Sequence, residues 1–344
     1  MIEGYHDERE LRAELAALAD ELGPRARFEL LGESVEGRPI DALTIAAPGR
    51  SPEPTRPVAV VIGAIHGNEV IASEAALGVA HRLARAASDR STGLMPAPAA
   101  GVGDGVRPRA TAADVAGSVL DAADVTVVPA VNPDARARSL ETLRRRPLAI
   151  PPRRNANGVD LNRNWPMAAG ARAHWLPWAG TDLPWLPWYR GPAPCSEPEV
   201  RALRSSFDAR PPAVLLNLHS VGEIVTYPWS SFDHPSPDRE GLEAMVAAFN
   251  RARPVGRRFR SKQSNAWYPI VSSSNDFVHD TYGTRAVTVE LSTLRAGARG
   301  ELRRLPRLFW WSNPRDPQSY VAEVVEPCLA AVAAGLSHPR PDGR

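Results

Sequence analysis

The 344-residue sequence has few cysteines, a single lysine and no long apolar run, and each shortage argues against a class of protein. Its two cysteines, Cys195 and Cys328, lie far apart, so they form neither a disulfide framework nor a cysteine-type metal site. No apolar run approaches the roughly 20 residues of a membrane-spanning helix. Lys262 is the only lysine, yet 41 basic residues nearly balance 39 acidic ones, so the overall charge does not favour a nucleic-acid partner.

The two ends of the chain have simple patterns. Residues 1–10 are acidic and polar and lack the apolar segment of a secretory signal, so we expect a cytoplasmic protein. Leucines at helical spacing predict a packing helix within residues 1–25, and a C-terminal amphipathic helix is predicted over 318–336. Residues 88–110 are rich in Gly, Pro, Ala and Ser, which is typical of a flexible loop.

Between the ends, short apolar runs alternate with helical patterns. Two alternating runs within 27–46 predict a β-hairpin. Four further runs predict buried strands, namely Val58–Ile62, Asp124–Val131, Ala213–Leu218 and Ala286–Leu291. The alternation of strands with helices predicts an α/β fold, in which helices cover both faces of the sheet.

Three other segments carry local signals. The stretch 136–154 is strongly basic, and such a run is most often a solvated segment. Ser196 and Glu199 have the spacing of a capping box, which predicts a helix with Ser196 as its N-cap. The tryptophan-rich loop 175–188 is open to three interpretations, as a wall of a cleft, a packing lid or an interface.

A candidate metal motif follows the first buried strand. His66 and Glu69 stand three residues apart between this strand and the next predicted helix, so both side chains can point at one metal ion. Alone, the pair can also be a surface histidine and a glutamate favoured by the helix dipole. Polar residues at other strand ends or in adjoining loops supply what a metal site still lacks: the segment Asp160–Asn164, His219 and Glu290.

These motifs, in this order, resemble those of the zinc carboxypeptidase family, the M14 metallopeptidases. His66-Gly67-Asn68-Glu69 is one form of that family's zinc motif, and Asn155–Pro166 is close to its most specific signature. Leu218-His219-Ser220 resembles the third-ligand motif, and Val289-Glu290-Leu291 the catalytic glutamate motif. The resemblance extends from Gly32 to about Thr293 and implies one α/β domain over residues 1–344, with a central mixed, twisted sheet of the eight-stranded type.

The resemblance also implies the roles of the site residues. His66, Glu69 and His219 would hold one Zn²⁺ and leave a coordination position open, as a catalytic zinc requires. Glu290 would act as the general base, because a carboxylate can take a proton from water and pass it to the leaving amine. Asp160 would orient the first histidine, although it can equally be a turn aspartate.

Further residues match the family's substrate contacts. Asn162 and Arg163 would hold the terminal carboxylate of the substrate, helped by Tyr268, which can alternatively be a loop-packing residue. Asn275 lies near the position that sets side-chain preference and suggests neither a strongly basic nor a large hydrophobic terminal residue.

An arginine should stabilise the oxyanion, and the neighbouring arginines leave more than one choice. Arg153 is our choice, because it begins a pattern, Arg-x-Asn-Ala-Asn-Gly-Val-Asp, that resembles the one in bacterial members of the family, while Arg154 and Arg145 stay open as alternatives. Asn68 replaces an arginine of the digestive members, which indicates a bacterial, non-digestive branch.

These residues predict a zinc metallocarboxypeptidase acting on a small peptide or acyl-amino-acid substrate, without nucleic-acid or membrane partners. One alternative is a murein-peptide (γ-D-glutamyl-diaminopimelate) amidase, or a tailoring amidohydrolase of a peptide metabolite, with the same site. Tyr268-Pro269 and the following Ser-rich turn resemble the cytosolic murein-peptide amidases. Another alternative is a zinc-less, peptide-binding pseudoenzyme. The sequence leaves the oligomeric state open.

Overall fold

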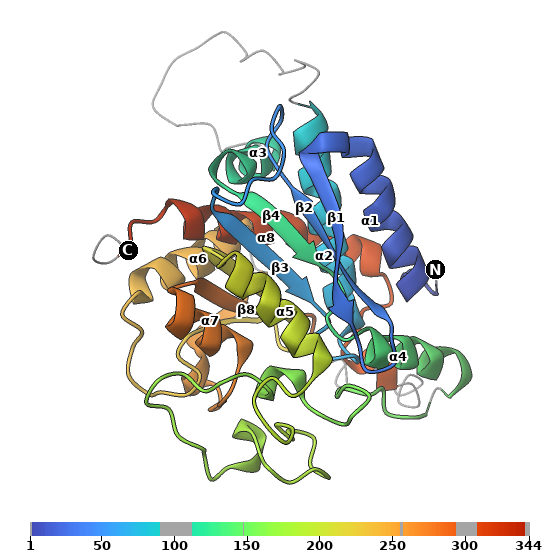
Figure 1. The fold of residues 1–344 in the computed structure, drawn as a ribbon, viewed down its shortest axis with the longest axis vertical. Helices are drawn as coiled ribbons and strands as arrows, with labels where there is room; N and C mark the ends of the chain where they lie inside the picture. Colours follow the sequence, from blue (N-terminus) through green and yellow to red (C-terminus); the bar gives the residue numbers. More distant parts are fainter. Residues whose placement is uncertain (1, 90–111, 147, 255–256, 294–307, 341–344) are drawn as a thin grey trace.

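The continuous apolar runs of the sequence form the central strands of one sheet (Figure 1). The structure is a computed structural model that describes residues 2–89, 112–146, 148–254, 257–293 and 308–340. The sheet has eight strands in the order β1-β2-β4-β3-β5-β8-β6-β7. Their bounds are β1 Ala26–Glu33, β2 Pro39–Ile45, β3 Val58–Gly63, β4 Asp124–Val128, β5 Val214–Ser220, β6 Ile224–Tyr227, β7 Arg260–Gln263 and β8 Arg285–Leu291.

The sheet is mixed, as predicted. Strands β4, β3, β5 and β8 run parallel to their neighbours in the centre, whereas β1, β2 and β6 join antiparallel. Because parallel strands end at the same edge, the loops that follow β3, β5 and β8 meet there. This edge is where the sequence places its candidate site residues.

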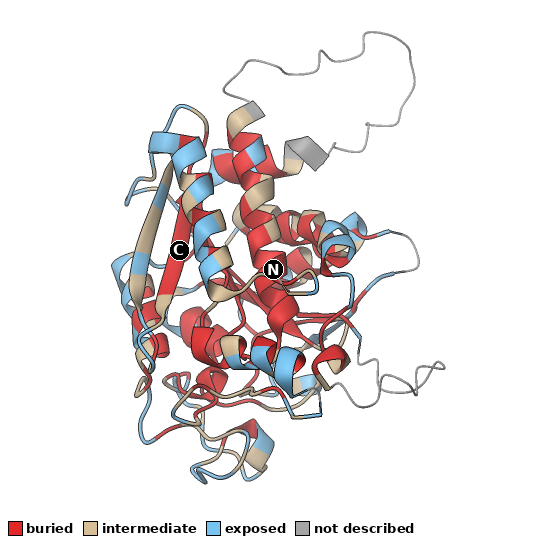
Figure 2. Ribbon diagram, turned by 90° about the vertical axis from the view of Figure 1, so that its right-hand side faces the viewer, coloured by how far each residue is buried: buried red, intermediate tan, exposed pale blue. Residues whose placement is uncertain are grey.

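Helices cover both faces of the sheet and complete the two hydrophobic cores. Alternate residues of β3 belong to different cores, Ala59 and Val61 to one and Val60 and Ile62 to the other. The first core lies under α1, α2, α3, α6 and α8, and the second under α5 and α7. Figure 2 shows buried positions along the inner sides of these elements. The helices are α1 Glu8–Leu22, α2 Val70–Asp89, α3 Ala112–Ala122, α4 Pro133–Arg145, α5 Pro198–Ala209, α6 Arg239–Ala252, α7 Ser274–Tyr282 and α8 Pro317–Ser337.

The two terminal helices form as their sequence patterns indicate. Asp7 caps α1 in a capping box with Glu10, and the four leucines of α1 at helical spacing are buried. Helix α8 is long and apolar enough to cross a membrane by length and composition alone. The sequence analysis did not indicate this, because polar residues interrupt its apolar run. Half of its most apolar stretch is buried, and α8 packs against α2, α3 and α6. The predicted flexible loop 88–110 falls largely on residues 90–111, outside the described residues.

The basic stretch 136–154 is not simply a solvated segment. Its first part belongs to α4, and Arg136 is fully buried. The guanidinium of Arg136 forms ion pairs with Glu8 Oε1 at 2.8 Å and with Glu74 Oε1 at 3.2 Å. These partners come from distant segments of the chain, so the local charge pattern could not reveal the burial of Arg136.

Candidate metal centre

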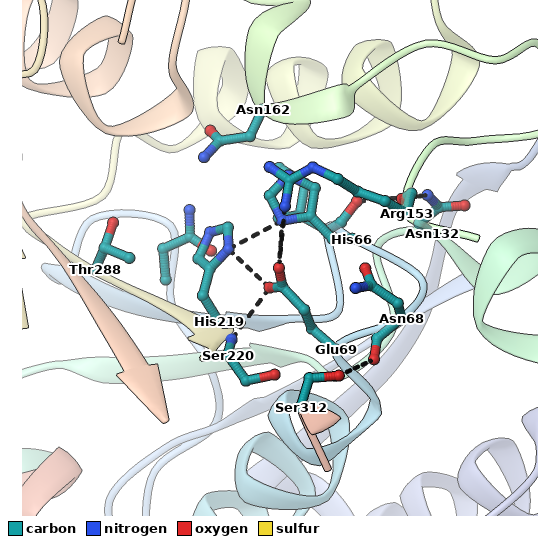
Figure 3. Close-up of polar contacts among 12 residues, drawn as sticks. His66, Asn68, Glu69, Asn132, Arg153, Asn162, His219, Ser220, Thr288 and Ser312 are labelled. Carbon is teal, nitrogen blue, oxygen red and sulfur yellow. Dashed lines mark hydrogen bonds and ion pairs between the residues drawn. The ribbon is translucent and has the colours of Figure 1, made fainter. Parts of the chain in front are cut away.

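Three candidate ligands converge at the ends of neighbouring strands (Figure 3). His66 lies in the loop after β3, Glu69 immediately before α2, and His219 near the end of the adjacent strand β5. The Nδ1 atoms of His66 and His219 lie 2.9 Å from the two carboxylate oxygens of Glu69 and 3.2 Å from each other. All three side chains are about 98% buried, each with 2% of its surface exposed. The predicted ligands are therefore brought together.

A glycine permits the close packing of the loop that carries two of these residues. A Cβ on Gly67 would lie 2.2 Å from the Cβ of Ala135 in the first turn of α4. The Gly67 N–H also donates to the carbonyl oxygen of Arg153 at 3.0 Å. The loop is thus fixed between α4 and the segment that supplies Arg153.

The chemistry of this cluster fits a cation. His66 Nε2 lies 3.0 Å from Asp160 Oδ1, so the ring donates there and its Nδ1 keeps a lone pair. Burial alone raises the pKa of Glu69, but His66 and His219 together hold that pKa below its usual range. Burial lowers the pKa of His219, against the opposing effect of Glu69. Two imidazole nitrogens and an ionised carboxylate, with ligand atoms within 4.8 Å of one another, are a donor set suited to Zn²⁺.

Asp160 joins this cluster to an arginine. It is fully buried, and its Oδ2 accepts from Arg153 Nε at 3.1 Å while its Oδ1 accepts from the Asn162 N–H at 3.0 Å. Burial opposes ionisation, but Arg153 and His66 hold the pKa of Asp160 well below its usual range. Asp160 is therefore a buried carboxylate with three donors and not a simple turn residue.

Of the three arginines considered for the oxyanion, the structure places one in the site. Arg153 Nη1 lies 3.2 Å from Glu69 Oε1, and its side chain lines the cavity beside the cluster. Burial opposes its charge, but Asp160 and Glu69 raise the pKa of Arg153 above its usual value. Arg154 instead donates to the carbonyls of Pro184 and Leu186, and Arg145 is largely exposed beside Glu141.

Glu290 lies beside the cluster because of strand register. In the parallel pair β5–β8, His219 is directly opposite Glu290. The Glu290 side chain is 8% exposed and lines the cavity. Burial and the nearby charge of Glu69 raise the pKa of Glu290 well above its usual value, although Arg153 and Arg163 oppose this.

Asn162 presents an amide to the cavity in a fixed orientation. Its Oδ1 accepts from the Ser274 backbone N–H at 3.1 Å and from the Ser274 hydroxyl at 3.0 Å. The oxygen is therefore occupied on the side of α7, and the Nδ2 group is left to donate. Asn162 lines the cavity, as expected for a residue that contacts the substrate.

Arg163 lies behind Asn162 and does not line the cavity. It is 1% exposed, and its guanidinium donates to the carbonyls of Asn162 and Trp178, each at 3.0 Å. Its Nε has no hydrogen-bond partner among the described residues. Tyr268 does line the cavity; burial raises the pKa of its hydroxyl, while the nearby positive charge of Arg163 opposes this. Arg163 thus lies outside the cavity lining but close enough to Tyr268 for its charge to act on that hydroxyl.

Asn275 lines the cavity, together with Thr288, a residue that sequence reasoning missed. Asn275 Nδ2 donates to Thr288 Oγ1 at 3.0 Å, and its Oδ1 accepts from Asn217 at 3.3 Å. Thr288 stands two positions before Glu290 on β8, and residues at that spacing face the same side of a strand. This periodicity could have identified Thr288 once Glu290 was placed.

The predicted capping box at Ser196 is wrong. Helix α5 begins at Pro198 and has Glu197 at the N-cap without a side-chain cap. Glu197 and Glu199 instead both accept from the Asn155 amide, at 2.7 and 3.0 Å. These buried acids hold the segment that follows Arg153, so their role is set by tertiary contacts and not by the local pattern.

Apart from Asp160 and Arg163, the predicted site residues line one cavity with a volume of about 580 Å³. This size is within the range of small-molecule sites. No residue of the tryptophan-rich loop 175–188 is among its described lining, so this loop is not a wall of the cavity. The lining consists of His66, Asn68, Glu69, Ile150, Pro151, Arg153, Asn162, His219, Ser220, Val221, Thr226, Ser230, Ser264, Trp267, Tyr268, Ile270, Ser273, Asn275, Thr288, Glu290, Leu308, Trp311 and Ser312.

Comparison with known sequences agrees with the motifs. The model of the zinc carboxypeptidase family matches residues 11–298. Carboxypeptidase B of Astacus astacus is 27% identical over 296 residues, which cover 83% of this chain and 86% of that protein. The catalytic chain of carboxypeptidase N of Homo sapiens is 23% identical over 330 residues, covering 87% and 65%. Carboxypeptidase E of Caenorhabditis elegans matches over 162 residues at 27% identity, covering 47% of this chain and 30% of that protein. The chain thus spans less than two thirds of several relatives.

Comparison with solved structures shows the same fold. Bovine thrombin-activatable fibrinolysis inhibitor superposes with a TM-score of 0.69 at 20% identity, covering 98% of this chain and 97% of that chain. Carboxypeptidase A from Helicoverpa armigera has a TM-score of 0.68 at 19% identity, covering 97% and 75%.

Proposed function

Because this chain belongs to the zinc carboxypeptidase family, whose members are hydrolases, we propose that it is a metallocarboxypeptidase for small substrates. It would hydrolyse the amide bond next to a free C-terminal carboxylate of a small peptide or acyl amino acid. One observation supports this most: a metal-type cluster, a buried carboxylate at Glu290 and the free amide of Asn162 line the same cavity.

His66, Glu69 and His219 are the residues that would hold a single Zn²⁺. When bound, zinc acts as a Lewis acid that polarises a carbonyl and lowers the pKa of water. Asp160 keeps His66 in the tautomer that offers Nδ1, and it holds Arg153 at the same time. The protein side of the metal site is therefore pre-organised by buried contacts.

Glu290 would carry the proton. Its raised pKa makes its carboxylate a stronger base than that of an exposed glutamate. In this role Glu290 accepts a proton from the attacking water and passes it to the nitrogen of the leaving amine. Arg153, which keeps its charge at any working pH, would stabilise the negative charge that develops on the scissile carbonyl oxygen.

Asn162 would bind the terminal carboxylate through its free Nδ2 group. Tyr268 lines the same cavity, and Arg163 lies behind both, so its positive charge favours an anion here. Where Asn275 and Thr288 line the cavity they present amide and hydroxyl groups, which favours an uncharged terminal side chain with hydrogen-bonding capacity.

A substrate panel with a base-deficient variant tests the proposal. Wild-type enzyme should release the C-terminal residue from dipeptides or acyl amino acids, and blocking the carboxylate as an amide should abolish hydrolysis. Glu290→Gln should keep its metal and still bind substrate but lose nearly all turnover. Substantial activity of Glu290→Gln would remove Glu290 from its role.

Adding γ-D-glutamyl-diaminopimelate peptides to the panel separates this proposal from the alternative functions. Activity restricted to γ-D-glutamyl-diaminopimelate peptides would identify a murein-peptide amidase instead. Absence of hydrolysis with any amide substrate, in a protein that holds its metal, would contradict the enzyme assignment.

A further inference from the structure

Residues that line the cavity lie on more than one side of the metal-type cluster (Figure 3). In this view Thr288 lies beyond His219 and Asn162 lies above the cluster, whereas Asn68 and Ser312 lie on the other side, beyond Glu69. If the terminal carboxylate binds at Asn162, as the proposed function requires, the acyl half of the substrate must extend toward Asn68. The lining of this second side therefore determines which acyl groups fit.

Contacts between segments place four apolar residues on this second side. Ser312 donates to the Asn68 carbonyl at 3.2 Å, which brings the short helix Leu308–Trp311 against the Asn68 loop. Arg153 accepts from the Gly67 N–H, which brings the preceding Ile150 and Pro151 to the same loop. Leu308, Trp311, Ile150 and Pro151 all line the cavity.

Four apolar side chains contribute to the surface of this side, next to the polar Asn68 and Ser312. Ile150 is 80% exposed where it lines the cavity, so a bound apolar group would remove its side chain from water. Leu308 and Trp311 are partly exposed in the same region. The charged side chains of the lining, Glu69, Arg153 and Glu290, belong to the metal-type cluster or lie beside it, and the four apolar residues themselves offer no charge.

A polar group on this side can fix the backbone of such a substrate. Asn68 lines the cavity, and its buried Oδ1 has no hydrogen-bond partner among the described residues. An amide N–H of a peptide or acyl amino acid can supply the missing donor. A charged acyl group would lose hydration against the four apolar side chains.

We propose that Ile150, Pro151, Leu308 and Trp311 form an acyl subsite, which selects substrates with an apolar, uncharged group on the carbonyl side of the scissile bond. N-aroyl or long-chain N-acyl amino acids are the simplest members of this class. The proposal rests on the carboxypeptidase function above.

Ile150→Ser tests the subsite, because its side chain is exposed and its replacement should not impair folding. Leu148→Ser is the matched control, since Leu148 is 69% exposed on the same segment but does not line the cavity. The assay is kcat/KM for the N-benzoyl, N-acetyl and N-succinyl forms of one amino acid, with zinc content measured for each protein.

Wild type should hydrolyse the benzoyl form roughly tenfold or more faster than the acetyl form, and the succinyl form most slowly. Ile150→Ser should lower kcat/KM for the benzoyl form several-fold and leave kcat/KM for the acetyl form unchanged. Leu148→Ser should change neither of these two values. Equal benzoyl and acetyl values in wild type, or an equal effect of Ile150→Ser on both, would refute the subsite and leave the carboxypeptidase proposal standing. Hydrolysis of none of the three would contradict both proposals.

Discussion

Replacement of Asp160 by asparagine should weaken zinc binding without preventing folding. Asp160 Oδ1 accepts from His66 and from the Asn162 N–H, and an asparagine oxygen can keep both contacts. Its Oδ2 accepts from Arg153 Nε at 3.1 Å, and in the variant an NH₂ group would face that donor. The variant therefore loses one buried ion pair and the negative charge that makes His66 a better ligand.

The magnitude follows from the kind of contact that is lost. Loss of a residue that orients a metal-bound histidine costs roughly 10- to 100-fold in metal affinity. This corresponds to about 1.4–2.7 kcal/mol. The assay is a competition titration of metal-free protein with a zinc-binding indicator, accompanied by circular dichroism to establish that the variant is folded.

Asp124→Asn is the matched control. Asp124 is also fully buried and pairs with Arg56 and Arg210, but it lies at the start of β4, at the opposite edge of the sheet. This variant should be less stable but should bind zinc as tightly as wild type. Unchanged zinc affinity of a folded Asp160→Asn variant would refute the orienting role of Asp160.

Two further predictions concern catalysis and stability. Arg153→Lys should lower kcat roughly 100-fold or more, because lysine cannot reproduce the forked contacts to Asp160 and Glu69. Arg154→Lys should have little effect on kcat, because Arg154 donates to backbone carbonyls away from the cluster. Equal losses of kcat for the two variants in steady-state kinetics would contradict this prediction. His279 is buried and neutral, and burial lowers its pKa, so the folded state resists protonation. The contribution of neutral His279 to the free energy of unfolding is complete above about pH 6.5, the pKa of histidine in the unfolded chain. This contribution is lost as the pH falls below that value. Thermal unfolding at about pH 7.5 and pH 5.5 should show a smaller acid-induced loss for His279→Gln than for wild type, and identical losses would exclude the effect.

The sequence was sufficient for the central strands and the ligand cluster. Strands β3, β5 and β8 are buried on both faces, so their continuous apolar runs are distinctive. Strand β7 is short, polar and exposed, and it forms only by pairing with β6, so no local pattern predicted it. The cytoplasmic location stays a prediction.

The site shows the same division between local and tertiary information. The sequence motifs were sufficient to predict His66, Glu69 and His219. Each motif lies at or just after the end of a buried strand that its apolar run identifies. The choice among neighbouring arginines required the fold, since only tertiary contacts distinguish Arg153 from Arg154. Ile150 and Trp311 were not predicted, because their position depends on contacts with the Asn68 loop.

The zinc content of the purified protein, measured together with hydrolysis before and after chelation, tests the central claim most directly. We predict about one zinc ion per chain, loss of both zinc and hydrolysis on chelation, recovery of both on adding zinc, and no zinc in His219→Ala. A folded wild-type protein that binds no zinc, or hydrolysis that survives complete removal of metal, would contradict the account.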